Sequence, residues 1–374
     1  MNDQHATAQE LSARAASLLA HGRAQEARRV FADAAEKEAA ALASVPPDRT
    51  KTRSVLSVSV ASLLYKGALL DEAERAVFRY LALGDLDGWA DTQLRELLQV
   101  VTDERTLMTT LARRYSGESM TVSLRGGEIG VGTGPLDVIV EKAAGFRNLL
   151  YRMAEWVGQF PLRHHGLPPK ELLDLVQARA TEPAAGSYRL EIRLTEPSQP
   201  DLFEPIRVAP AELSDRLFKF LECLTAGTLK DLEDMVPQRE YRKALLQLTR
   251  NIVPSGRRVR EIGIYRKTQD RIQSVYLTDA LPPRIREAMP RPPKLPTEEH
   301  TSCRGILRAL HLDRNWLTLT LEDGSHITCD TVPDMLDDVV GPMVNRTVLV
   351  AGPVRQRGGQ SRLLVSDIEA VDEE

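Results

Sequence analysis

The spacing of apolar residues changes near residue 116, and this change limits the folds open to the chain. Before that point, apolar side chains recur every three or four residues, which is the period of amphipathic helices. Beyond it, several short segments alternate apolar and polar residues, which is the period of half-buried strands. At 374 residues the chain exceeds the usual domain size of roughly 100–200 residues. We therefore expect a multi-domain α+β protein that begins with helices.

Two helical hairpins are predicted in the first domain, residues 1–115. The segments GRAQEARRVFADAA and GALLDEAERAVFRYLA each carry a turn glycine, a Glu-Ala pair and a bulky residue about four positions later. Ala27 and Ala73 are small enough to let two helices approach closely, and Phe31 and Val77 would fill the space one turn on. Two further segments, GWADTQLRELLQVV and DERTLMTTLARR, are predicted to be separate capping helices.

This Gly…Glu-Ala…Phe pattern resembles tetratricopeptide repeats. The two Glu-Ala pairs lie 46 residues apart, whereas the family repeats every ~34 residues. The resemblance implies antiparallel helical hairpins whose groove binds peptides or other proteins, and it carries no catalytic residue. We therefore interpret the first domain as a non-enzymatic scaffold or adaptor that binds partner proteins.

A glycine-rich stretch, RGGEIGVGTG, occupies residues 125–134. Neither phosphate-binding motif is met, because no lysine follows Gly132 as a P-loop requires, and Pro135 stands where the dinucleotide fingerprint requires glycine. The segments MTVSL and EIGV instead predict two short strands joined by a turn at Gly126-Gly127, with a helix beginning at Pro135. The glycines are interpreted as turns, and no cofactor is predicted.

The central domain, residues 116–281, is predicted to be an α+β domain with an antiparallel sheet. The predicted helices are PLDVIVEKAAGFRNLLYRMAEWVG, AELSDRLFKFLECLTAG and QREYRKALLQLTRNIV. The predicted strands are AAGSYRLEIRLTE and the terminal pair RRVREIGIYR and RIQSVYLT. ELLDLVQARAT is predicted to be a strand, and a helix that begins after Pro168-Pro169 is the alternative.

A proline-rich linker and a small barrel are predicted to complete the chain. Six prolines between Pro282 and Pro296 define a linker, residues 282–297, that we expect to be stiff and extended. Residues 298–374 hold five short alternating segments and one helix, with a tight turn at Asp323-Gly324. This order looks like a small β-barrel of the OB-fold or SH3-like type. The combination of all three domains also resembles a group of bacterial proteins, which implies an architecture and no function.

Charge is distributed unevenly along the chain. Residues 239–294 contain 14 arginines and lysines against 5 acids, and residues 298–374 contain 7 against 14. The barrel is therefore acidic, and its only aromatic side chain is Trp316, which disfavours single-strand binding there. The candidate anion or nucleic-acid contacts are Arg257, Arg258, Arg260, Arg266, Lys267 and Arg271. Two interpretations stay open: this run docks on acidic parts of the same chain, which is favoured, or it binds RNA or DNA.

No catalytic, cofactor-binding or metal-binding residue is predicted. His164-His165 lack a third ligand at a readable spacing, and no nucleophile motif is present. An enzyme with its site in the central domain is therefore only the third hypothesis. Three scattered cysteines, no apolar run near ~18 residues and no signal sequence lead us to expect a cytoplasmic protein without membrane contact.

Overall fold

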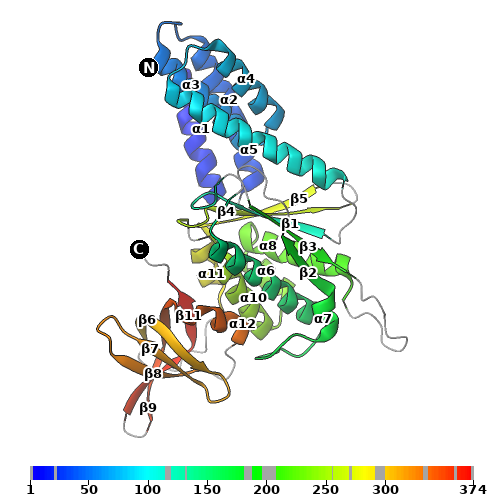
Figure 1. The fold of residues 1–374 in the computed structure, drawn as a ribbon, viewed down its shortest axis with the longest axis vertical. Helices are drawn as coiled ribbons and strands as arrows, with labels where there is room; N and C mark the ends of the chain where they lie inside the picture. The colour runs from blue at the N-terminus through cyan, green and yellow to red at the C-terminus, as the bar shows by residue number, and fades with distance from the viewer. Residues whose placement is uncertain are drawn as a thin grey trace.

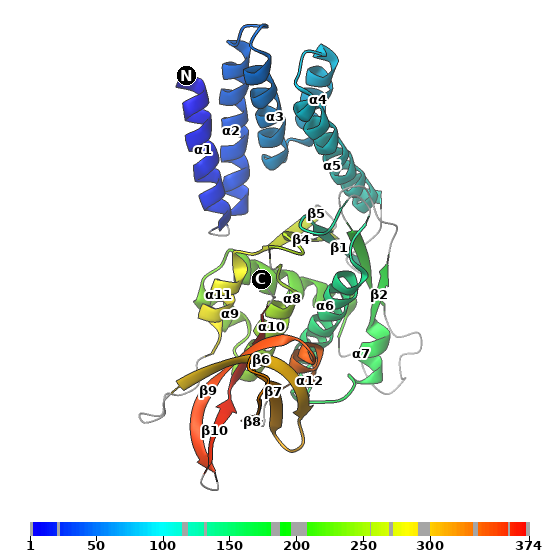
Figure 2. The same ribbon diagram turned by 60° about the vertical axis from the view of Figure 1, so that its left-hand side comes forward.

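The computed structural model describes residues 3–20, 23–113, 119–130, 133–180, 188–195, 208–254, 256–268, 272–290, 300–331, 336–357 and 360–371. They form a stretch of helices, then an antiparallel sheet with helices, then a closed barrel. Figures 1 and 2 show these three parts following one another along the long axis, with the N-terminal helices at one end and the barrel at the other. The predicted α+β fold class is confirmed.

The N-terminal part is a series of antiparallel helices, each packed on the next along the chain. The helices are α1 (Asp3–Ala20), α2 (Ala24–Ala43), α3 (Thr50–Lys66), α4 (Leu70–Leu83) and α5 (Gly88–Arg113). The prediction of two separate capping helices is wrong, because α5 runs through both segments without a break. No proline and no glycine after Gly88 interrupts its sequence.

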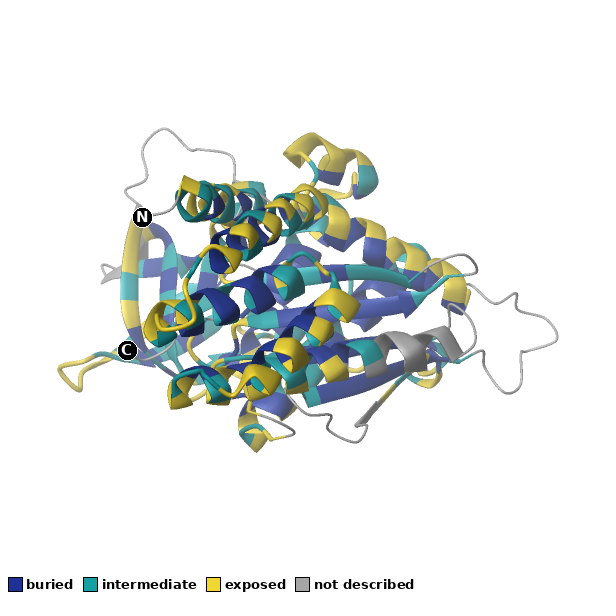
Figure 3. Ribbon diagram, turned by 90° about the horizontal axis from the view of Figure 1, so that it is seen from above, coloured by how far each residue is buried: buried dark blue, intermediate teal, exposed yellow. Residues whose placement is uncertain are grey.

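The residues chosen to mark the helix crossings are buried. Ala27 and Ala73 are fully shielded from solvent, and Phe31 and Val77 lie in the cores between the helices. Seen from this end of the molecule, exposed residues follow the outward faces of the helices (Figure 3). The predicted packing of small residues against large ones is therefore confirmed for these positions.

The substitution Ala27→Leu is expected to lower the free energy of unfolding by about 1–3 kcal/mol, because the added methylenes must fit into a filled crossing. Ala82→Leu on α4 is the matched control, because Ala82 is exposed and should tolerate the larger side chain. Urea unfolding followed by circular dichroism measures both changes. Equal effects for the two variants would contradict the helix packing.

The central sheet is antiparallel throughout, in the order β2-β3-β1-β4-β5. Its strands are β1 (Ser119–Arg125), β2 (Val176–Ala180), β3 (Tyr188–Leu194), β4 (Glu261–Lys267) and β5 (Ile272–Thr278). The predicted pairing of the last two is confirmed. ELLDLVQARAT contains both of the predicted alternatives, since a short helix runs directly into β2.

The described residues of the glycine-rich stretch do not form the predicted hairpin. They make isolated bridges, between Gly126 and Ile129 and between Gly130 and Thr133, and residues 131–132 lie outside the described residues. β1 instead pairs with β3 and β4, which satisfy both of its edges and leave no place for a local partner. Gly126 and Gly127 do form a turn, with φ of 67° and 72°, a region that glycine adopts without strain.

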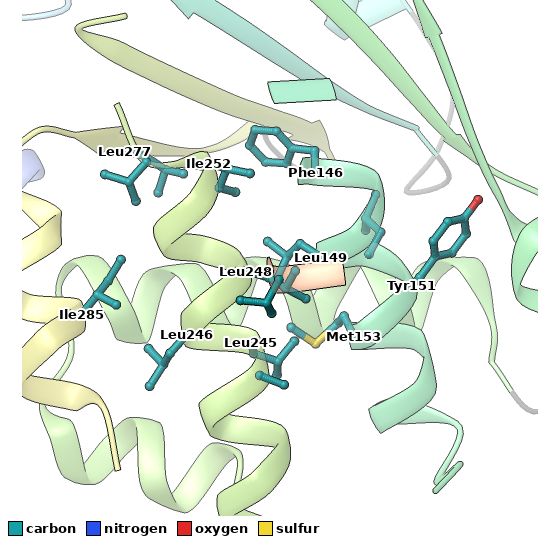
Figure 4. Packing of buried hydrophobic residues seen from close by; sticks show 14 of the residues in the cluster. Phe146, Leu149, Tyr151, Met153, Leu245, Leu246, Leu248, Ile252, Leu277 and Ile285 are labelled. Carbon is teal, nitrogen blue, oxygen red and sulfur yellow. The ribbon is translucent and has the colours of Figure 1, made fainter. Parts of the chain in front are cut away.

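Helices cover one face of this sheet, and the N-terminal helices lie over the other (Figures 1 and 2). The covering helices are α6 (Leu136–Val157), α7 (Lys170–Leu175), α8 (Pro210–Thr225), α9 (Leu229–Met235), α10 (Arg239–Ile252) and α11 (Leu281–Ala288). Figure 4 shows the apolar side chains of α6 and α10 interdigitating beneath the strands, among them Phe146, Leu149 and Leu248.

The first half of the proline-rich linker is not extended. Pro282 and Pro283 lie in the first turn of α11, where a missing N–H costs no hydrogen bond. Leu281 and Ile285 of this helix are buried in the core of the central domain. The extended conformation predicted for residues 282–297 is therefore wrong for the part that belongs to α11, and residues 291–297 lie outside the described residues.

Five strands close the C-terminal barrel in the order β6-β7-β8-β10-β9 and back to β6. Its elements are β6 (His300–His311), β7 (Trp316–Thr320), β8 (His326–Thr331), α12 (Asp337–Val340), the 3₁₀ turn η1 (Gly341–Met343), β9 (Thr347–Arg357), β10 (Gln360–Val365) and β11 (Asp367–Ala370). β11, which was not predicted, pairs with β9 outside the barrel. The tight turn at Asp323-Gly324 is confirmed, with Gly324 at φ 81°.

The barrel and the central domain share one continuous hydrophobic core. Val339 of α12 and Met343 of η1 join the same cluster as Leu149 of α6 and Leu246 of α10. The N-terminal helices have separate cores. The barrel is therefore packed on the central domain, and we call these two parts together the platform.

This division predicts two unfolding transitions in denaturant. Each part of the chain carries one tryptophan: Trp89 in the N-terminal helices, Trp156 in the central domain and Trp316 in the barrel. In single-tryptophan variants, Trp156 and Trp316 should report the same midpoint, because their domains share a core, and Trp89 should report another. A separate midpoint for Trp316 would contradict the shared core.

Candidate functional site

The basic run predicted from the sequence lies before and on β4, beside the glycine turn. Arg257, Arg258 and Arg260 precede the strand, Arg266 and Lys267 end it, and Arg271 lies outside the described residues. A Cβ on Gly127 would lie 2.4 Å from the carbonyl oxygen of Arg257, so the glycine turn lies directly against this loop. The backbone N–H of Glu128 also donates to the carbonyl oxygen of Arg258, at 2.9 Å.

Arg258 is paired inside the central domain. Its guanidinium lies 2.6 Å from a carboxylate oxygen of Asp137 at the start of α6 and 3.4 Å from Glu128. The hydrogen bond between Arg258 and Asp137 raises the pKa of Arg258 and lowers that of Asp137. The partner of Arg258 is thus neither the acidic barrel nor the N-terminal helices, which is where the sequence placed the docking.

Arg266 points away from the rest of the run and is buried. Side chains alternate along β4, so Tyr265 and Lys267 face the N-terminal helices and Arg266 faces α8. There its guanidinium lies 4.5 Å from the ring centroid of Phe218 and 2.5 Å from Asp215. Arg266 therefore joins α8 to the sheet, and its charge is not available on the surface that the sequence suggested.

Arg257 and Arg260 are the members of the run before β4 whose side chains are exposed. Two exposed arginines release few counterions, so we expect no retention of single-stranded RNA or DNA at about 100 mM salt. Fluorescence anisotropy with a labelled oligonucleotide measures this. Micromolar binding that is abolished by Arg257→Glu together with Arg260→Glu would instead establish the nucleic-acid hypothesis.

Ion pairs formed by other basic residues join the central domain to the acidic barrel. Both Nη atoms of Arg250 on α10 donate hydrogen bonds to the carboxylate of Asp367, at 2.9 and 3.1 Å. The same guanidinium lies 3.6 Å from Glu369. Arg346 of the barrel lies 3.0 Å from Glu141 of α6. Arg250 therefore contacts the acidic barrel, whereas docking was predicted for the run around Arg258.

A buried ion cluster lies at the same junction. Arg152 of α6, fully shielded from solvent, contacts Glu155 at 2.9 Å and Asp338 of α12 at 2.7 Å. Arg163 lies 2.7 Å from Glu155 and 3.4 Å from Asp338. The turn that holds His164-His165 also docks here, because Asp337 of α12 donates its N–H to the carbonyl oxygen of His164. This turn is thus a structural joint.

A cavity of about 360 Å³ lies between the barrel and the helices α6, α10 and α11. This volume is typical of small-ligand sites. Basic residues line it, among them Lys142, Arg250 and Arg346. However, the ammonium group of Lys142 donates to the carbonyl oxygens of Asn251 and Val253, at 3.2 and 3.5 Å, and so ends α10. Arg250 and Arg346 are paired as described above. The cavity therefore belongs to the joint between the two domains.

A polar layer separates the sheet from the N-terminal helices. Arg125 of β1 is central to it: its guanidinium contacts the carboxylate of Glu104 on α5, lies 3.6 Å from Glu261 and donates to Ser123 at 3.3 Å. Arg28 of α2 lies 5.4 Å from the ring centroid of Tyr276 on β5. The contact with the platform is thus made by ion pairs and cation–π contacts.

The phenols of this layer are kept protonated by burial, which raises the pKa of Tyr65 and of Tyr265. The ring of Tyr265 packs edge-on against Tyr276, with 5.8 Å between centroids, and covers Gly263, where a Cβ would collide with it. Burial also raises the pKa of Glu261, although Arg125 opposes this. Polar junctions of this kind permit movement between domains more readily than apolar ones.

The end of the N-terminal helices away from the sheet carries exposed apolar side chains. Val55 of α3 is 46% exposed, Leu83 of α4 is 49% exposed and Trp89 of α5 is 43% exposed. Phe78 lies five residues before Leu83 on α4, about 7.5 Å along the helix axis, and is 56% exposed. We call these four residues the distal surface.

Polar contacts hold the distal surface together. Arg53 lies 3.4 Å from Asp85, and Asp87 donates its backbone N–H to the hydroxyl of Ser54 at 2.9 Å. Both contacts tie the α4–α5 turn to the beginning of α3, beside Val55. Glu104, which contacts the sheet, lies 15 residues after Trp89 on the same helix. A rise of 1.5 Å per residue therefore places Trp89 about 22 Å from that contact.

Sequence reasoning did not identify the distal surface. In the pattern that located the repeats, Val77 was aligned with Phe31, and both are buried. Because Val77 is buried, the next residue, Phe78, lies on the outward side of α4. A large apolar residue directly after the buried repeat position was therefore the sequence feature that could have indicated this surface.

Comparisons with models of protein families, with curated proteins and with solved structures return no match for this chain. No group of three His, Cys, Asp or Glu side chains suited to a metal ion occurs among the described residues. Within the same residues, no helix is both long and apolar enough to cross a bilayer. The function is therefore inferred from the geometry.

Proposed function

We propose that this chain is a non-enzymatic adaptor that binds a partner protein through the distal surface. Four large apolar side chains lie exposed at one end of the N-terminal helices, and this observation carries the proposal. Several large apolar side chains exposed at one end of a helical array are candidates for an interaction site. Tryptophan in particular is enriched among the residues that dominate binding energy.

The rest of the molecule supports this role by holding the surface in place. The turn between Leu83 and Trp89 is fixed to α3 by Arg53 and Ser54. Binding should therefore cost little conformational entropy at this turn. The opposite end of the helices rests on the polar layer of the platform. The adaptor thus presents a preformed surface at one end of the chain and a second body at the other.

The finer fold assignments belong to the same proposal. We infer that the N-terminal helices are tetratricopeptide-type repeats, because Ala27 and Ala73 occupy equivalent buried crossings. We infer that the barrel is of the OB type. Its support is the parallel pair β8–β10 that closes it and the helix α12 between its third and fourth strands. We also place the adaptor in the cytoplasm.

Affinity capture from host extract tests the proposal. Wild type should retain a partner protein that the double variant Phe78→Ser with Trp89→Ser does not retain, because the apolar anchors are gone. Leu167→Ser is the matched control: Leu167 is 82% exposed, in the loop before α7 on the platform, and its loss should leave capture unchanged. Nuclease treatment of half of each sample identifies capture through nucleic acid.

Equal capture by wild type and the double variant would overturn the assignment of the distal surface. Capture that disappears on nuclease treatment would show that the partner is bound through nucleic acid, as the alternative hypothesis holds. Thermal unfolding of each variant is measured alongside, because serine at exposed positions should change stability little.

A further inference from the structure

The central sheet ends on a strand with an open edge. β5 is the last strand of the sheet and pairs only with β4. In an antiparallel pair, alternate residues direct their N–H and C=O groups away from the partner strand. Among the described residues, no backbone hydrogen bond is made on that outer side. Alternate residues of this seven-residue strand thus offer unused donors and acceptors.

This edge lacks the features that usually protect one. Its sequence, IQSVYLT, holds no charged residue and no proline, and charges and prolines are the common devices against pairing with another chain. The opposite edge, β2, is shorter, with five residues, and includes Arg179. The barrel strands close on one another, and β11, which pairs only with β9, has four residues and includes Asp367 and Glu369. β5 is therefore the strand best suited to pair with another chain.

We propose that β5 pairs antiparallel with β5 of a second copy of this chain, so that one sheet runs through both copies. A register centred on Val275 pairs all seven residues. It places Ser274 opposite Tyr276 of the other copy, and no charges meet. Val275 and Leu277 would continue the apolar face on the side of the covering helices.

The helix under this edge fits the same partner. α8 contacts β5 and exposes Glu212, Arg216 and Lys219 on its polar side. Acids and bases are both present there, so a two-fold axis can bring opposite charges together. A two-fold interface is made by the same surface on both copies and must be complementary to itself. A neutral strand above a helix of mixed charge meets that requirement.

The substitution Ser274→Lys tests this interface. In the proposed register the two lysines would lie ~7–8 Å apart on one face of the sheet. Repulsion at an effective dielectric constant of about 20 should raise the dissociation constant roughly 40-fold. Ala178→Lys on β2 is the control, because Ala178 is exposed and also lies on an edge strand.

Light scattering of the full chain should give twice the 41.6 kDa chain mass for wild type and for Ala178→Lys, and the single mass for Ser274→Lys at the same concentration. A single mass for wild type at about 100 μM, or an unchanged dimer in Ser274→Lys, would overturn the proposal.

Amide hydrogen exchange on wild type gives an independent measurement that needs no variant. Outward amides of β5 should exchange faster on dilution. Exchange in β5 that does not depend on concentration would also overturn the interface.

Discussion

Asp338→Ala is expected to lower the free energy of unfolding by about 3–5 kcal/mol, because it leaves buried guanidinium charge without one of its partners. Arg152 has no exposed surface, and Asp338 is one of its two carboxylate partners. Arg163 also loses a contact at 3.4 Å. Because Arg152 is fully shielded from solvent, the lost carboxylate leaves its charge poorly compensated, and the cost exceeds that of a surface pair.

The same variant should weaken the platform. Asp338 lies in the first turn of α12, which joins the barrel to α6 and α10 through the shared core. We expect the Trp316 transition to move to lower denaturant concentration together with Trp156. Glu26→Ala, which breaks the exposed pair with Arg23, is the control and should leave the midpoint unchanged. A loss in Asp338→Ala no larger than in this control would show that the buried cluster is not a structural joint.

Gly127→Ala is expected to lower the free energy of unfolding by about 3–4 kcal/mol, because backbone strain and a backbone clash add. Gly127 has φ of 72°, a region that costs alanine about 1–2 kcal/mol. The new Cβ would also lie 2.4–2.6 Å from backbone atoms of Arg257 and Arg258, which cannot rotate away as a side chain would. The turn must open, and the bond from Glu128 to Arg258 is lost with it.

Gly84→Ala separates the two contributions to that cost. Gly84 has φ of 68°, nearly the value at Gly127, and a Cβ there would meet nothing within 4 Å. Its substitution should show the strain alone. Urea unfolding of both variants should therefore give a clearly larger loss at Gly127. Equal losses would mean that the glycine turn does not lie against the arginine loop.

The N-terminal helices could be predicted from sequence because their packing depends on near neighbours. Ala27 and Phe31 lie one turn apart on the same helix, and this spacing is visible in the sequence. The break predicted within α5 had no such support, because neither glycine nor proline interrupts that helix. Local patterns thus identified the crossings and overestimated the number of helices.

Pairing in the central sheet could not be predicted, because its partners lie far apart in the chain. Met120 of β1 pairs with Ile192 and with Arg266, and nothing near β1 in sequence indicates either. The predicted hairpin with EIGV was the closest local alternative. Long-range pairing on both edges of β1 prevailed because it satisfies more backbone groups in the core of the domain.

The fate of the arginines depended on three-dimensional context. Alternation along β4 places neighbouring residues on opposite sides of the sheet, but it does not show which side the helices cover. Phe218 and Asp215 of α8 bury Arg266, and Asp137 pairs Arg258. The uneven charge favoured docking of this run on acidic parts of the chain, and the individual partners of Arg258 and Arg266 could be identified only in the structure.

Photo-crosslinking from the distal surface tests the proposed function most directly. A photoreactive amino acid at position 83, introduced in the host cell, should yield a covalent product with one partner protein, because Leu83 is one of the exposed side chains of that surface. The same amino acid at position 167, on the platform, should not yield it. No protein product from position 83, or the same product from both positions, would contradict an adaptor that binds through the distal end of its helices.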